Sequence, residues 1–128
     1  MKNLSVRFIF VASLFALAGM AWGIQMSSSG NHTLASAHAH NNLIGWVTMA
    51  IYGLYYGVVP SAANSMLAKA HFWLSLLGAL LIGPGVAMAV LAQGEIVAIT
   101  ASFLTILAMA SFTLVVWNNR GAMMGKAG

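Results

Sequence analysis

The feature that most constrains this chain is a set of four long apolar runs within only 128 residues. The runs cover approximately residues 8–24, 38–59, 71–92 and 96–117. Each is about as long as the 17–25 residues that a helix needs to cross the hydrocarbon core of a bilayer. A helix satisfies its backbone hydrogen bonds within its own segment, which lipid requires. We therefore predict an all-α protein, with residues 1–128 forming one integral membrane domain and a four-helix transmembrane bundle.

The composition points to the same class of protein. Hydrophobic residues make up 61% of the chain and charged residues 5%, whereas soluble domains have about 25% charged residues. The apolar surplus must therefore face lipid. The basic residues are scattered singly and form no patch, so we expect the bilayer as a partner and no nucleic acid. The chain lacks cysteine and aspartate, which excludes disulfides, iron–sulfur clusters and a Ser–His–Asp catalytic set.

The distribution of charge predicts an orientation. With four spans, every basic residue falls on one side of the membrane and the single carboxylate, Glu95, falls on the other. Cytoplasmic loops are enriched in Lys and Arg, so we expect both termini to be cytoplasmic, in a bacterial inner membrane. The basic residues are Lys2, Arg7, Lys69, Arg120 and Lys126.

The first apolar run has an alternative interpretation. Lys2 and Arg7 followed by an apolar stretch also describe a secretory signal peptide. The stretch is long for a signal core and no clear A-x-A cleavage site follows it, which favours a retained helix.

Two histidines near the start of the second run are the main candidates for chemistry. His38 and His40 flank Ala39, just before a fully apolar stretch. An ionisable residue at a membrane span is a functional hypothesis by default, and imidazole is a common axial ligand of haem iron. Residues two apart on a helix point about 200° apart, which suits two sites better than one chelated ion. The alternative is that one or both histidines only cap the helix start in the polar headgroup layer, beside Asn41 and Asn42.

The other two histidines have weaker claims. His71 begins the third run, near the expected cytoplasmic face, and we expect an interfacial or helix-capping residue there. Along a helix, His40 lies about 28 Å from Val59, the end of the second run. His71 comes after Val59, near the opposite membrane face, so it cannot share a ligand with His40. His32 lies in the polar loop after the first run, where solvent exposure is the simplest expectation.

Glycines and aromatic residues predict how the spans pack. The pairs Gly19/Gly23 and Gly53/Gly57 have the small-x-x-x-small spacing that lets helices approach closely. The Gly83-Pro84-Gly85 sequence predicts a kinked or loosened third helix. Aromatic residues near the span ends are expected at the membrane interface. They are Trp22, Tyr55, Tyr56, Trp73 and Trp117.

The second and third runs contain, in order, His38-Ala39-His40, Gly45-Trp46, Gly53, Tyr55-Tyr56, Pro60 and Ala70-His71-Phe72-Trp73. This pattern resembles part of subunit I of the haem–copper oxidases, nearest to the C-type oxidases and nitric oxide reductases. The similarity covers about residues 37–94 and matches the family's tenth and eleventh helices. It implies that His38 ligates a high-spin haem and that His40 ligates a low-spin haem.

The resemblance implies a small membrane protein that binds haem b, with His38 and His40 as ligands of the haem iron. Its role would be respiratory electron transfer, gas binding or an accessory function. The family's copper-binding histidines have no counterpart here, so the resemblance does not extend to autonomous oxidase activity. A second copy of the chain, meeting at the face of Gly53 and Gly57, or subunits of a respiratory complex would complete the haem site.

Two alternatives belong to other functional classes. One is a cofactor-free structural or assembly membrane protein that associates with oxidase subunits through its glycine-rich helix faces. The other is a transporter or channel subunit, with the histidine pair in a polar vestibule.

Overall fold

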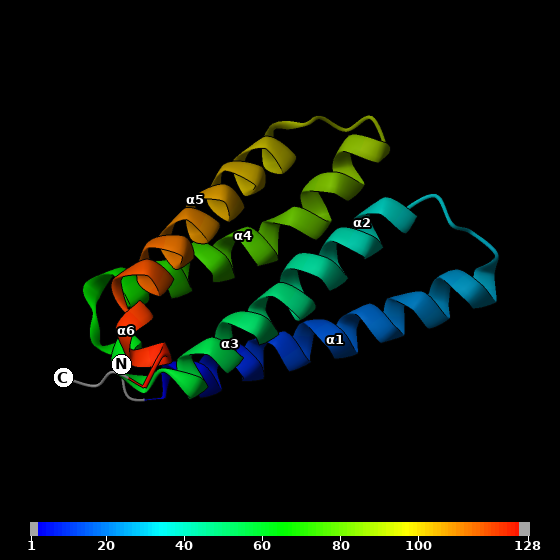
Figure 1. Cartoon of the computed structure of the whole chain (residues 1–128). Helices are drawn as coiled ribbons and strands as arrows, with labels where there is room; N and C mark the ends of the chain where they lie inside the picture. The colour runs from blue at the N-terminus through cyan, green and yellow to red at the C-terminus, as the bar shows by residue number, and fades with distance from the viewer. Residues whose placement is uncertain (1–2, 126–128) are drawn as a thin grey trace.

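The computed structural model describes residues 3–125, and helices account for most of this range (Figure 1). Three of them, α1 (Leu4–Ser29), α4 (Met66–Val90) and α5 (Ile96–Asn118), are long and apolar enough to cross a membrane. No strand occurs within the described residues. The prediction of an all-α chain is confirmed, and the three helices indicate an integral membrane protein.

The second apolar run forms a composite helical segment. It consists of α2 (Ala35–His40), the π-helix η1 (Asn41–Thr48) and α3 (Met49–Val58), which follow one another directly. The backbone stays right-handed helical at both junctions, and Figure 1 shows the three pieces along one line. The Thr48 hydroxyl donates to the carbonyl oxygen of Leu43, five residues earlier, at 2.6 Å. The single α-helix expected over residues 38–59 is therefore interrupted by a π-helical stretch.

Polar capping residues extend the helices beyond their apolar runs. The third run was expected to begin at His71, but α4 begins at Met66 because Ser65 accepts a hydrogen bond from the amide of Ala68 at 3.0 Å. The first helix is extended at its C-terminal end: α1 continues to Ser29 and stops at Gly30, which has φ 65°. Glycine takes this left-handed conformation without the steric penalty of a Cβ. Two short helices complete the chain, the 3₁₀ helix η2 (Pro60–Asn64) and α6 (Arg120–Met123).

The long elements pack mainly as neighbours in a row. α5 packs on α4, α4 packs on α2 and η1, and α1 packs on η1 and α3. The start of α1, η2 and α6 lie at one end of the molecule, which we call the η2 end (Figure 1). The connections at residues 30–34 and 91–95 lie at the other end, the loop end.

The charged residues divide between these two ends. Arg7, Lys69 and Arg120 lie on elements at the η2 end, and Glu95 precedes α5 at the loop end. Lys2 and Lys126, which also entered the predicted orientation, lie outside the described residues.

The glycine pairs pack the helices of this chain against each other. A Cβ on Gly53 would lie 2.8 Å from Ile9 side-chain atoms, and one on Gly57 would lie 3.1 Å from Ser5 Oγ. The Ser5 hydroxyl also donates to the carbonyl oxygen of Gly53 at 2.7 Å. The predicted role in close packing is confirmed. The expectation that two copies meet at this face is wrong, because α1 of the same chain covers it.

The α4–α5 contact also depends on glycine. A Cβ on Gly85 would lie 2.6 Å from the backbone nitrogen of Ala98, so the two backbones approach too closely for a side chain there. α4 nevertheless remains one helix through Pro84. The Gly-Pro-Gly sequence therefore serves close packing on α5 and leaves α4 unbroken.

The main hydrophobic core lies toward the η2 end. It joins α1, α3, η2, α4 and α5, so every long element contributes to it. Its buried members are Leu4, Phe8, Ala12, Met49, Tyr52, Tyr56, Val59, Ala62, Ala63, Ala68, Phe72 and Val115.

Candidate functional site

His38 lies between α2 and α1. Its Nε2 is 3.0 Å from the carbonyl oxygen of Gly19 and 3.1 Å from the side-chain nitrogen of Asn42. The ring meets the indole of Trp22 edge-on, with centroids 5.7 Å apart. A protonated Nε2 donates to Gly19, and an unprotonated Nε2 accepts from Asn42. In both cases Nε2 takes part in a hydrogen bond that packs the helices. That hydrogen bond would have to break before Nε2 could bind iron.

His40 has a different environment. Its Nδ1 lies 2.8 Å from the carbonyl oxygen of Ser36, one turn earlier in the helix. Since a carbonyl oxygen only accepts, Nδ1 carries the hydrogen and Nε2 of the neutral ring has a lone pair. Within residues 3–125, no protein group forms a hydrogen bond with this Nε2. Metal-ligating histidines commonly have their second nitrogen fixed by such a carbonyl contact, so His40 fits an axial ligand better than His38 does.

The structure does not bring the histidines together around one point. His32 lies in the loop before α2 with its Nδ1 3.2 Å from the carbonyl oxygen of Gly30, and it is exposed as expected. Among the described residues, no group of three or more His, Cys, Asp or Glu side chains is arranged to hold a metal ion. Haem ligation by His38 and His40 needs no such group, and it stays a prediction.

Asn41 and Asn42 do more than cap a helix. Asn41 is 9% exposed, and its side-chain nitrogen donates to the carbonyl oxygen of Phe15 in α1 at 3.4 Å. A Cβ on Gly19 would collide with the Asn42 amide, so a residue without a side chain is needed there. Asn41 and His38 thus attach the start of the composite segment to α1 through backbone carbonyl oxygens, and the Asn42 amide lies against Gly19 and His38. We call His38, Asn41 and Asn42 the α1 contact cluster.

His71 is the most deeply buried histidine. It is 0% exposed, and its Nδ1 lies 2.9 Å from the hydroxyl oxygen of Tyr56. His71 was expected to be an interfacial or capping residue. It does not cap the helix, because α4 begins earlier, at Met66, and places His71 inside the core. Tyr56, expected at the membrane interface, is likewise buried, at 2% exposure.

Aromatic rings surround the His71 imidazole. The ring centroids of Tyr52, Phe8 and Phe112 lie 4.4, 5.1 and 5.4 Å from its own. Nε2 of His71 is buried without a hydrogen-bond partner among the described residues, as is the hydroxyl of Tyr55. An unpaired buried polar atom costs about 1–3 kcal/mol, so the tight ring packing and the bond from Tyr56 must offset this cost. We call His71, Tyr56, Tyr52, Phe8 and Phe112 the His71 aromatic cluster.

Nothing in the sequence pairs Tyr56 with His71. They are separated by fifteen positions, and the turn at η2 brings α3 and α4 together so that the two side chains meet. The one available signal was Pro60, which ends α3 and begins that turn.

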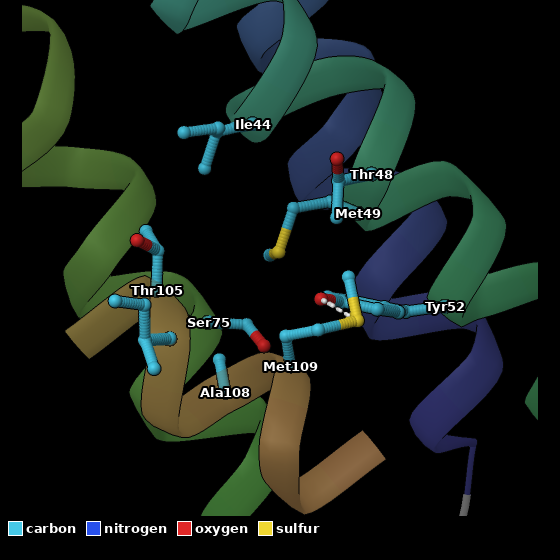
Figure 2. A pocket seen from close by; sticks show the side chains of 9 residues that line it. Ile44, Thr48, Met49, Tyr52, Ser75, Thr105, Ala108 and Met109 are labelled. Atoms are coloured by element: carbon cyan, nitrogen blue, oxygen red, sulfur yellow. Dashed lines mark hydrogen bonds between the residues drawn. The ribbon is translucent and has the colours of Figure 1, made fainter. Parts of the chain in front are cut away.

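A cavity of about 230 Å³ lies between η1, α3, α4 and α5 (Figure 2). Its hydroxyl groups are already used: Tyr52 donates to Met109 Sδ at 3.8 Å, and Ser75 donates to the carbonyl oxygen of His71 at 2.7 Å. The cavity therefore suits an apolar occupant. Its lining residues are Ile44, Thr48, Met49, Tyr52, Ser75, Thr105, Ile106, Ala108 and Met109.

Compared with known proteins, the chain matches no protein-family model, no curated protein and no solved structure.

Proposed function

We propose that this chain is an integral membrane protein of four spans that binds haem b through His40. The observation that carries the proposal is the bond from His40 Nδ1 to the carbonyl oxygen of Ser36, which leaves Nε2 with a lone pair for iron. A haem held there would supply one-electron transfer or a binding site for a diatomic gas. The resemblance to oxidase subunit I adds His38 as a second candidate ligand.

The fourth span in this proposal is the composite segment α2–η1–α3. Residues 35–58 form a helical run about as long as α5, one of the three membrane-length helices. If this run also crosses the bilayer, Arg7, Lys69 and Arg120 share one side and Glu95 lies on the other. The positive-inside rule then places the η2 end in the cytoplasm, in a bacterial inner membrane.

His38 has a separate part in the proposal. Its Nε2 already contacts Gly19 and Asn42, so it would ligate haem only after α2 and α1 separate locally. A second axial ligand would come more readily from another copy of the chain or from a respiratory-complex subunit. A second copy would have to use a face other than that of Gly53 and Gly57.

The test is a pyridine-haem assay on protein purified in detergent from haem-sufficient cells. We expect wild type to show a Soret band, and His40→Ala to lose most of the bound haem. His32→Ala is the matched control, because His32 is an exposed loop histidine, and it should retain the haem. A colourless wild type, or equal haem content in all three proteins, would overturn the proposal.

The second candidate is a cofactor-free structural or assembly membrane protein. The observation that favours it is the α1 contact cluster, where His38 and Asn41 contact α1 carbonyl oxygens and Asn42 contacts His38. For this candidate, His38→Ala should lower thermal stability in a preparation that contains no haem.

A further inference from the structure

A second feature of the structure lies on α5 at the η2 end. A groove of about 430 Å³ runs along this helix to Arg120. Its one hydroxyl, on Thr113, donates to the carbonyl oxygen of Met109 at 3.0 Å and offers no hydrogen to a ligand. The groove is therefore apolar along its length and cationic at one end. It is lined by Met109, Phe112, Thr113, Val116, Trp117 and Arg120.

Arg120 is held in place at the mouth of this groove. Its guanidinium carbon lies 4.4 Å from the ring centroid of Trp117, and Nη1 donates to the Trp117 carbonyl oxygen at 2.7 Å. A guanidinium has five N–H donors, so most remain available to a ligand. The planar fork of donors matches the oxygens of a phosphate group.

The length of the groove comes close to the thickness of one leaflet of a bilayer. From Trp117 to Met109, α5 rises by about 12 Å at 1.5 Å per residue, and Arg120 follows at the start of α6. The hydrocarbon core is about 30 Å thick, so one leaflet occupies about 15 Å. A phosphate at Arg120 would therefore let an acyl chain follow the groove toward the middle of the bilayer.

The local charge favours an anionic lipid. Arg7 and Lys69 lie at the same end of the molecule as Arg120, whereas Glu95, the one acidic side chain, lies at the loop end. Basic groups near the membrane surface attract anionic headgroups. Met109 lines both this groove and the apolar cavity in Figure 2.

We propose that this groove binds one anionic phospholipid, with its phosphate on Arg120 and an acyl chain along α5 from Trp117 to Met109. The site requires only that α5 crosses the bilayer, so it is independent of haem binding and of the orientation of the chain.

The test is native mass spectrometry of the full chain in detergent, with phosphatidylglycerol and phosphatidylcholine of identical acyl chains as probes. Wild type should retain phosphatidylglycerol preferentially. Arg120→Gln should lower its apparent affinity at least tenfold and lower that of phosphatidylcholine less, because the choline cation already offsets the charge of that phosphate. Lys69→Gln is the matched control, because it removes a charge at the same end and outside the groove, and its effect should be less than twofold.

A second variant tests the acyl-chain part of the site. Thr113 is exposed in the groove, so Thr113→Trp should fill the groove without disturbing the core and should weaken binding of both lipids. Circular dichroism would verify the helical fold of each variant. Equal losses for Arg120→Gln and Lys69→Gln would show diffuse attraction and overturn the site. Unchanged binding by Thr113→Trp, or no preference in wild type, would overturn it as well.

Discussion

The hydroxyl oxygen of Tyr56 lies 2.9 Å from Nδ1 of His71, where both side chains are buried. This contact joins the end of α3 to the first turns of α4 across η2. Phe8 from α1 and Phe112 from α5 contact the same imidazole, at centroid distances of 5.1 and 5.4 Å. One polar pair therefore lies at the point where all four long helical segments meet.

The first prediction concerns this hydrogen bond. Tyr56→Phe should destabilise the protein by about 1–2 kcal/mol, because it leaves Nδ1 of His71 buried without its partner. The measurement is unfolding in mixed micelles with increasing denaturing detergent, followed by circular dichroism. Tyr55→Phe is a matched control, since the Tyr55 hydroxyl is buried and has no hydrogen-bond partner within residues 3–125. That variant should be neutral or slightly stabilising, and equal losses in the two variants would contradict the prediction.

The second prediction is that Tyr56 and His71 are energetically coupled. His71→Phe keeps a ring in the cluster and leaves the Tyr56 hydroxyl unpaired, so alone it should destabilise the protein. The double variant Tyr56→Phe/His71→Phe removes both polar groups, and replacing both partners by apolar rings can be nearly neutral. We expect the double variant to be more stable than additivity requires, by about 1–2 kcal/mol. Strict additivity in the same unfolding assay would show that the two side chains act independently.

The apolar runs predicted the helical elements well because hydropathy and length are local properties of the sequence. The helix ends were less predictable, since they depend on polar residues outside the runs. Ser65 starts α4 before His71, and Gly30 stops α1 after a polar stretch that hydropathy treated as loop. This displacement of the start of α4 is also why His71 was expected at an interface and lies in the core.

The contacts of the histidines were not predictable from the sequence for a different reason. His38 and His40 bond to carbonyl oxygens of Gly19 and Ser36, and every residue has such a carbonyl, so no sequence pattern marks it. The π-helical stretch η1 is similarly invisible to hydropathy. It turns Asn41 toward the Phe15 carbonyl, a contact that depends on how α1 and η1 pack.

The third prediction concerns the α4–α5 contact. Gly85→Ala would place a Cβ 2.6 Å from the backbone nitrogen of Ala98 and 2.8 Å from its Cα. The two helices must then separate, at a cost of about 1–3 kcal/mol. Gly83→Ala, two residues away on the same helix, is the control. Its Cβ would meet its nearest neighbour, Asn41 Cβ, at 3.6 Å, an ordinary contact.

These two alanine variants should therefore differ in stability although they make the same chemical change. Gly83→Ala should stay within about 0.5 kcal/mol of wild type, because alanine also favours helix. Thermal unfolding in detergent provides the comparison. A Gly83→Ala protein as unstable as Gly85→Ala would show that flexibility around Pro84, and not close packing on α5, is what requires glycine here.

The last prediction tests whether the composite segment α2–η1–α3 crosses the membrane. The chain contains no cysteine, so a thiol reagent can label only the one cysteine that is introduced. If the reagent cannot cross membranes, labelling shows on which side of the membrane that residue lies. Asn31 and Asn64 flank the segment, Gln93 lies between α4 and α5, and all three are exposed. In intact cells we expect labelling of Asn31→Cys and Gln93→Cys. Asn64→Cys should react only after permeabilisation, because Lys69 and Arg120 favour a cytoplasmic η2 end. Labelling of Asn31→Cys and Asn64→Cys from the same side would mean that this segment does not span the bilayer, and the four-span proposal would be wrong.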